Sequence, residues 1–198
     1  MHLISILGHS LILLPASIAL IAVLVTAHAR RDALAFAVAL VVCLTGTLGA
    51  KLAFEACRWG VSGLGIESPS GHASLSALVY GALAVLLATE RPAGRQALIF
   101  IGAFALILLI GLSRVAVEAH TPEEVVAGLL IGGVCVLIFA ALRGRPKHLI
   151  VPWRALFLMS PFALALVLSV LFRGGRWTPE PLIDAVARRI GAHFGLCA

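Results

Sequence analysis

The sequence predicts an all-α fold, a membrane helix bundle with about six transmembrane helices. Hydrophobic residues make up 61% of the 198 residues and charged residues only 12%, whereas soluble domains contain about 45–50% apolar and about 25% charged residues. A bilayer admits only helix bundles and closed barrels, and these apolar runs are too continuous for the alternating strands of a barrel. Residues 1–198 are therefore expected to form one transmembrane domain.

The expected spans are the apolar runs of roughly 20 residues, the length that crosses a bilayer as a helix. They lie near residues 3–27, 33–53, 72–87, 97–112, 121–142 and 153–172. The tail that follows, residues 178–198, predicts a short amphipathic helix at 180–194 that lies in the membrane interface. A docked or frayed terminus is the alternative interpretation of this tail.

The net charge of +6 indicates membrane topology rather than a nucleic-acid partner, because no basic run is interleaved with aromatic residues. Six spans place the connections 57–71 and 113–120 on one face of the membrane. The opposite face carries a set of basic residues: Arg30, Arg31, Arg91, Arg95, Arg143, Arg145, Lys147 and Arg154. Short basic loops are typically cytoplasmic, so we expect the other two connections to face the periplasm from a bacterial inner membrane.

The segment that follows the fourth span carries a candidate nucleophile, His120. It precedes Thr121-Pro122-Glu123-Glu124, a typical helix start with Thr121 as cap and proline in the first position. Glu124 lies within reach of the imidazole and is expected to fix its tautomer, as the acid of a catalytic triad does. Thr121 and Glu124 also match a capping box, which needs no catalysis. The two roles of Glu124 do not exclude each other.

A second candidate cluster, Ser70-Gly71-His72, opens the third span. Amide groups at a helix start bind anions, and Gly71 permits close approach of the backbone. Ser70 adds a hydroxyl donor, and His72 is placed to give a proton to a leaving oxygen. Helix capping alone is the competing interpretation of such a cluster.

Three cations, Lys51, Arg58 and Arg114, accompany the two histidines. Lys51 and Arg58 are seven residues apart and project from one helix face. Converging cations favour a polyanion, and phosphate fits them best; snorkelling at the membrane surface is the alternative for Arg58. No acidic cluster is present to hold Mg²⁺ or Zn²⁺, so we expect a reaction that uses no metal and no cofactor.

Together these motifs resemble the three-part signature of the type-2 phosphatidic acid phosphatase family. The motifs are Lys51-x6-Arg58, Pro69-Ser70-Gly71-His72 and Ser113-Arg114-x5-His120-x3-Glu124, all within residues 51–124. The resemblance implies that His120 is the nucleophile, that His72 is the general acid, and that Glu124 orients His120. It also implies that Lys51, Arg58, Ser70, the Gly71 amide and Arg114 hold the phosphoryl group. The sequence departs from the family pattern at Trp59, where proline is usual, and at Glu124, where aspartate is usual.

By this resemblance the substrate is a lipid phosphate or diphosphate, with a polyprenyl diphosphate such as undecaprenyl diphosphate favoured. Phosphatidic acid, phosphatidylglycerophosphate and lipid A are the alternative substrates. A lipid phosphotransferase, which passes the phosphoryl group to a second lipid, is an enzymatic alternative. A catalytically degenerate lipid-binding protein is the non-enzymatic one, and the glutamate at position 124 is the residue that favours it.

Overall fold

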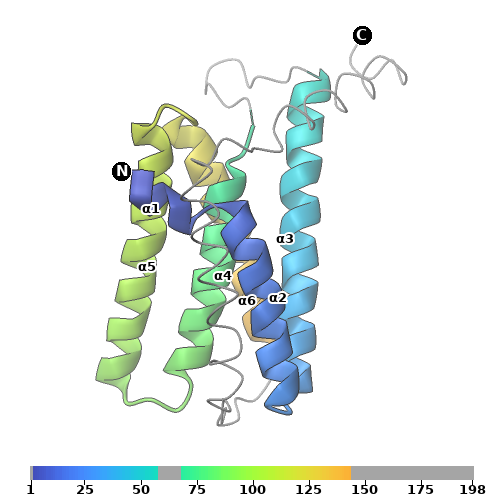
Figure 1. Ribbon diagram of the computed structural model, residues 1–198, viewed down its shortest axis with the longest axis vertical. Coiled ribbons are helices and arrows are strands. Elements are labelled where there is room, and N and C mark those ends of the chain that lie inside the picture. The colour runs from blue at the N-terminus through green and yellow to red at the C-terminus, as the bar shows by residue number, and fades with distance from the viewer. Residues whose placement is uncertain (1, 58–67, 144–198) are drawn as a thin grey trace.

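The computed structural model describes residues 2–57 and 68–143, and this part of the chain is helical without a β-strand (Figure 1). The all-α prediction is therefore confirmed for these residues. The expected sixth span, the amphipathic tail and Arg58 lie outside the described residues. The helices are α1 (His2–Leu7), α2 (Ser10–Thr26), α3 (Arg30–Cys57), α4 (Gly71–Ala88), α5 (Ala93–Ala116) and α6 (Pro122–Arg143).

The four helices α3 to α6 are long and apolar enough to cross a membrane. Their outer faces carry large side chains that no other part of the described structure covers, such as Leu98, Ile101 and Leu137, which are 71%, 64% and 69% exposed. Such continuous apolar surface is stable against lipid and not against water. The chain is therefore an integral membrane protein, and about six spans remain a prediction.

The first expected span, 3–27, is not one continuous helix. His9 has extended backbone angles, φ −68° and ψ 133°, and its ring nitrogen accepts the Leu11 amide as the cap of α2. Gly8 precedes it at a point where a Cβ would collide with Ile110 of α5. The chain therefore breaks at Gly8 and His9, and α2, with 17 residues, is shorter than the four candidate spans.

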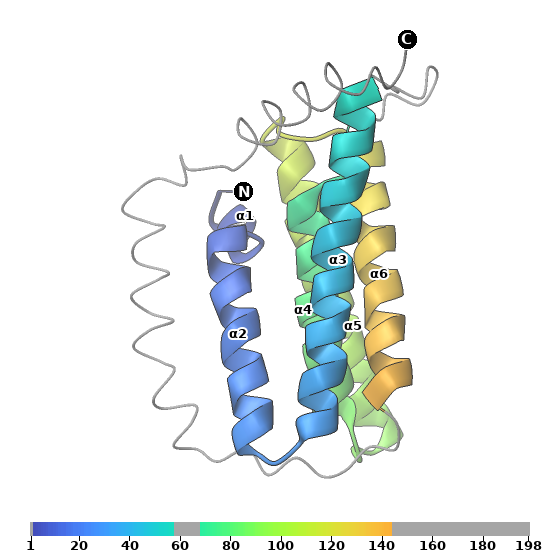
Figure 2. The same ribbon diagram turned by 90° about the vertical axis from the view of Figure 1, so that its right-hand side faces the viewer.

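Helix α4 lies in the centre of the bundle and packs against α2, α3, α5 and α6 (Figures 1 and 2). Its most extensive contact is with α6, which turns Gly128 and Gly132 toward α4. A Cβ on Gly128 would overlap the Ser70 carbonyl oxygen, and one on Gly132 would overlap that of Ser74. Small residues spaced by four allow helix backbones to approach in this way.

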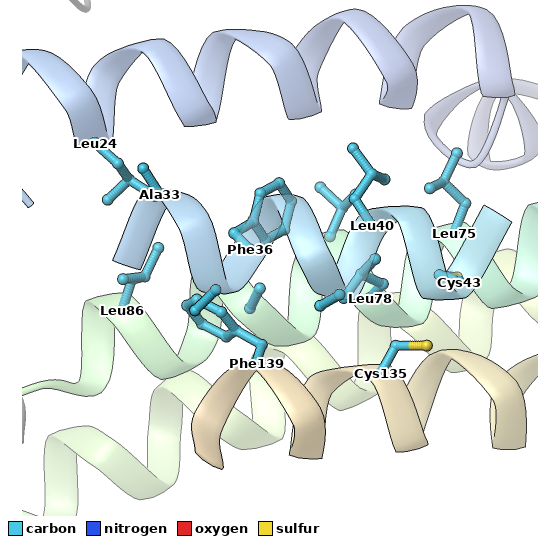
Figure 3. Close-up of a cluster of buried hydrophobic side chains, with 14 of the residues drawn as sticks. Leu24, Ala33, Phe36, Leu40, Cys43, Leu75, Leu78, Leu86, Cys135 and Phe139 are labelled. Atoms are coloured by element: carbon cyan, nitrogen blue, oxygen red, sulfur yellow. The ribbon is translucent and has the colours of Figure 1, made fainter. Parts of the chain in front are cut away.

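The apolar core lies between α2, α3, α4 and α6 (Figure 3). Phe36 of α3 and Phe139 of α6 are fully buried and meet edge to face, with centroids 5.9 Å apart at 88°. Leu78 of α4 is also fully buried in this cluster. These contacts set the relative positions of α3, α4 and α6, the helices that carry Lys51, His72 and Glu124.

The end of the bundle away from the motifs is tied by a buried arginine. Arg143 at the end of α6 donates to Asp32 of α3 at 3.3 Å and to Thr89, which follows α4, at 3.0 Å. Arg143 is 6% exposed, so its ion pair with Asp32 is shielded from water. The bonds of Arg143 to Asp32 and Thr89 connect α6 with α3 and with the end of α4.

Candidate active site

The antiparallel order of the helices brings the predicted site residues to one end of the bundle. Helices α3 and α5 end there, and α4 and α6 begin there, beside α1 (Figure 1). The N-termini of α4 and α6 therefore both present their free amide groups at this end, where they favour a bound anion.

His120 and Glu124 are in direct contact. His120 Nδ1 lies 2.8 Å from Glu124 Oε2, and the two side chains are only 6% and 8% exposed. An ionised carboxylate can only accept, so Nδ1 carries the hydrogen of this bond. The tautomer then leaves the lone pair on Nε2, which is the nitrogen that can act as a nucleophile.

The capping box at the start of α6 is also present. Glu124 N donates to Thr121 Oγ1 at 3.3 Å, and Thr121 N donates to Glu124 Oε2 at 3.2 Å. The same carboxylate thus caps the helix and contacts the histidine, as the sequence allowed.

The segment before α4 is attached to the same glutamate. Ser68 N donates to Glu124 Oε1 at 2.9 Å, and Ser70 N donates to the Glu124 carbonyl at 3.0 Å. These two bonds fix the N-terminus of α4 against the N-terminus of α6. They bring the second and third motifs together although 56 residues separate Ser68 from Glu124.

Ser70 and Gly71 begin α4 as expected. Ser70 is fully buried, and its hydroxyl oxygen caps the helix with a long contact of 3.5 Å to Ala73 N. A Cβ on Gly71 would meet only Thr47, at 3.9 Å, among the described atoms. Packing among the described residues therefore does not require glycine at position 71.

His72 is 8% exposed, and its Nε2 is buried with no hydrogen-bond partner among the described residues. Its electrostatic neighbours are Arg114, Lys51 and the imidazoles of His9 and His120. A buried imidazole nitrogen without a hydrogen-bond partner is costly unless a ligand, water or another residue meets it. The buried Nε2 of His72 therefore favours a polar ligand bound in this cluster.

Of the other residues in and beside the three motifs, the structure describes Lys51 and Ser113 but not Arg58 or Trp59. Lys51 is 6% exposed in α3, which agrees with its place inside an apolar run. Ser113 is fully buried and donates its hydroxyl to the Ile110 carbonyl of its own helix at 2.6 Å. Arg58 and Trp59 lie outside the described residues.

Two residues at this end, Ser5 and His9, were not predicted from the sequence. Arg114 Nη1 donates to Ser5 Oγ at 2.9 Å. The His9 ring meets the His72 ring edge to face, with centroids 5.2 Å apart at 85°. The one available signal is that small and polar residues interrupt the first apolar run at Ser5, Gly8, His9 and Ser10.

The cluster gathers the kinds of groups that binding and transfer of a phosphoryl group would require. Two cations, two helix N-termini and the hydrogen-bond donors of His72 offer charge and hydrogen bonds to phosphate oxygens, while His120 offers a nucleophilic nitrogen. Within the described ranges, no three His, Cys, Asp or Glu side chains gather as metal ligands, and independence from metal stays a prediction.

Comparison with known proteins identifies the family of the chain. The PAP2 superfamily model matches residues 33–147, more than half of the chain. An uncharacterized 22.5 kDa protein in the cps region of Klebsiella pneumoniae is 31% identical over 196 residues, which cover 96% of this chain and 91% of that protein. No significant match exists among solved structures.

Shorter matches join the chain to two mammalian enzymes. The glucose-6-phosphatase catalytic subunit 1 of dog is 39% identical over 77 residues, which cover 34% of this chain and 22% of the dog protein. The mouse enzyme is 37% identical over 89 residues, which cover 40% of this chain and 25% of the mouse protein. These matches support a phosphatase of the hydrolase class, and the chain belongs to the PAP2 superfamily.

Proposed function

We propose that this protein is a metal-independent lipid phosphatase that forms a phosphohistidine at His120. The observation that carries the proposal is the 2.8 Å contact between His120 Nδ1 and Glu124 Oε2. This contact leaves the lone pair of Nε2 on the side of the ring away from the carboxylate. His120 is also one of the electrostatic neighbours of His72. A nucleophile, its orienting acid and a candidate proton donor thus share one site.

The reaction has two displacements at phosphorus. In the first, His120 Nε2 forms a P–N bond while the P–O bond to the leaving group breaks, and protonated His72 gives a proton to the departing oxygen and becomes neutral. The leaving group is the lipid alcohol of a monophosphate substrate or the lipid monophosphate of a diphosphate substrate. In the second, His72 takes a proton from water, the water oxygen forms a P–O bond, and the P–N bond breaks. Inorganic phosphate leaves, and both histidines return to their starting forms.

The phosphoryl oxygens are held by Lys51, Arg114 and the amide of Gly71, with Arg58 and the Ser70 hydroxyl as further proposed ligands. Charge on these oxygens spreads in the transition state, so cations and amides fixed in a dry site stabilise it. Burial of Lys51 supports this role, because a lysine that is only 6% exposed would act on a bound phosphate with little screening by water.

The substrate class that we favour is a polyprenyl diphosphate, for example undecaprenyl diphosphate, dephosphorylated at the periplasmic face of a bacterial inner membrane. Apolar helix faces that border the site support a lipid substrate, because lipid tails can lie against them while the headgroup enters the cluster. The alternatives are phosphatidic acid, phosphatidylglycerophosphate and lipid A. Because two relatives are glucose-6-phosphatases, glucose 6-phosphate serves as a water-soluble substrate to compare with the lipids.

A phosphate-release screen over these five substrate types tests the proposal with the purified protein in detergent. We expect release from at least one lipid in the presence of EDTA, and none from His120→Ala. Brief reaction with ³²P-labelled substrate, stopped in alkali, should leave label on the wild-type protein and not on His120→Ala.

The outcomes separate the competing functions. Transfer of label to an added acceptor lipid, in place of release to water, would support the phosphotransferase. Glucose 6-phosphate as the sole substrate would replace the lipid class. No turnover of any substrate would support the catalytically degenerate lipid-binding protein.

A further inference from the structure

The end of α1 and the residues that join it to α2 contact one motif residue on α4, His72, and one on α5, Arg114. We call Ser5 to His9 the N-terminal elbow. Ser5 and His9 are 8% and 7% exposed, although neither belongs to the three motifs. This burial is not a general property of the first helices, because Leu7 between them is 42% exposed.

Three contacts fix the elbow in place. Tyr80 of α4 donates its hydroxyl to the Leu7 carbonyl at 2.9 Å. Gly8 fits where a Cβ would collide with Ile110 of α5 and approach Ser76 of α4 to 3.1 Å. His9 Nδ1 accepts the Leu11 amide hydrogen at 3.2 Å. The break between α1 and α2 therefore packs closely against α4 and α5.

From this position the elbow contacts one proposed phosphate ligand and one proposed acid. Ser5 Oγ accepts from Arg114 Nη1 at 2.9 Å, which fixes the guanidinium. The His9 ring lies edge to face with His72 at 5.2 Å. His72 Nε2 has no hydrogen-bond partner in the described part of the chain, so among these residues the contact with the His9 ring is available to orient it.

The tautomer of His9 follows from its cap. Because Nδ1 accepts the Leu11 amide hydrogen, the neutral ring carries its own hydrogen on Nε2. A protonated His9 would lose this cap and add a cation beside Arg114 and Lys51, which already face His72. His9 is therefore suited to present a neutral ring edge or face to His72.

We propose that Ser5 and His9 are positioning residues of the active site: His9 orients His72 as the proton donor to the leaving group, and Ser5 orients Arg114 toward the phosphoryl oxygens. The inference rests on the proposed phosphatase function. It assigns a catalytic contribution to a segment that the three motifs do not include.

The two roles predict different dependence on the leaving group. Proton donation matters for an alkoxide leaving group and little for p-nitrophenolate, which departs without a proton. A defect in His72 should therefore lower kcat/KM for a short-chain phosphatidic acid much more than for p-nitrophenyl phosphate. A defect in Arg114 should lower both values alike, because both substrates present the same phosphoryl oxygens.

The test compares His9→Asn, His9→Phe and Ser5→Ala in detergent with both substrates. Asparagine keeps an oxygen that can cap α2 and removes the ring. We expect it to lower kcat/KM about 10–100-fold for the phosphatidic acid and to change it little for p-nitrophenyl phosphate. Phenylalanine keeps the ring and loses the cap, so it should lower thermal stability but keep the wild-type ratio of the two values.

Ser5→Ala should lower both kcat/KM values by the same factor, about tenfold, as expected for one lost hydrogen bond to a charged group. His28→Asn is the matched control, because His28 is an exposed histidine at the opposite end of α2 with φ 57°, an angle that asparagine tolerates. It should leave both values unchanged.

Equal losses on the two substrates in His9→Asn, or no loss at all, would overturn the inference while the phosphatase proposal stands. A wild-type protein that cleaves neither ester, nor any lipid in the screen above, would overturn the proposed function and this inference with it.

Discussion

Among the described residues, Glu124 accepts three hydrogen bonds through one carboxylate, from Ser68 N, Thr121 N and His120 Nδ1. The extra methylene relative to aspartate places this carboxylate where it can serve the helix cap and the histidine together. The departure from the family pattern is therefore accommodated by the local geometry. Because Oε2 takes two of the three bonds, the histidine contact depends on an oxygen that accepts and never donates.

This geometry predicts that Glu124→Gln lowers kcat by about 10²–10⁴-fold. A glutamine that keeps its oxygen on Ser68 N turns its NH₂ group toward His120 and Thr121. His120 Nδ1 must then accept, so the ring hydrogen moves to Nε2 and removes the nucleophilic lone pair. The measurement is phosphate release at saturating substrate.

Glu124→Asp is the control for this prediction, since it keeps a carboxylate and restores the acid usual in the family. It should stay within about tenfold of wild type. Full activity in Glu124→Gln would instead reduce Glu124 to the capping-box role.

The sequence predicted the motif residues because each motif combines a helix start or end with polar groups that are rare in an apolar chain. Lys51, His72 and Glu124 are all buried in the structure, and Lys51 is among the charged neighbours of His72, while their roles remain predictions. His9 and Ser5 could not be predicted in the same way. Their place depends on how α1 folds back on α5, which no local pattern encodes.

At the scale of elements, the α4–α6 contact determines how the second motif meets the third. Gly128 and Gly132 allow α6 to approach the Ser70 and Ser74 carbonyls of the α4 segment. The same approach brings Ser70 N to the Glu124 carbonyl at 3.0 Å. The spacing of the two glycines is visible in the sequence, but their partner helix is not.

We predict that Gly132→Ala separates α6 from α4 and impairs the site. The added Cβ meets a backbone carbonyl, which cannot rotate away, so the overpacking should cost about 1–3 kcal/mol. The melting temperature in detergent and the phosphatase activity should both fall.

Gly133→Ala is the matched control, because a Cβ at Gly133 meets nothing within 4 Å. Both variants gain the same helix propensity from alanine, about 1 kcal/mol. The difference between their stabilities therefore measures the cost of the contact between the added Cβ at position 132 and the Ser74 carbonyl. Equal stability and activity in the two variants would contradict the role given to Gly132.

Helix bounds were predicted less well than helix existence. The span expected at 97–112 is part of a helix from Ala93 to Ala116 that begins after Pro92. Apolar runs mark the part of a helix that lipid covers, whereas hydrogen bonding continues into the polar ends. The sequence did not predict the break at Gly8 and His9, because the residues around it are mostly apolar and so resemble one continuous span.

At the scale of the whole molecule, the basic residues divide between two ends. Among the described residues, Arg30, Arg31, Arg91, Arg95 and Arg143 lie at the end away from the site (Figure 1). The cations of the site end, Lys51 and Arg114, are buried or half-buried in the cluster. Short loops rich in arginine remain in the cytoplasm, so we expect the site to face outward.

Two glutamates offer a matched pair for testing this orientation. Glu118 lies in the turn between α5 and α6 near the site, and Glu90 lies between α4 and α5 at the other end. Their φ angles are 55° and 57°, and both are exposed, so a cysteine is equally strained and equally reachable at either position. Cys57 and Cys197 are replaced by serine in both variants, while Cys43 and Cys135 are buried.

A membrane-impermeant maleimide applied to bacterial spheroplasts should label Glu118→Cys at once and Glu90→Cys only after lysis. The reverse pattern would place the phosphoryl cluster in the cytoplasm. A periplasmic diphosphate carrier would then be out of reach, and the substrate would have to be a lipid of the inner leaflet. The orientation therefore decides between substrate classes that the chemistry of the histidines alone does not separate, because both leaflets present the same phosphate group to His120.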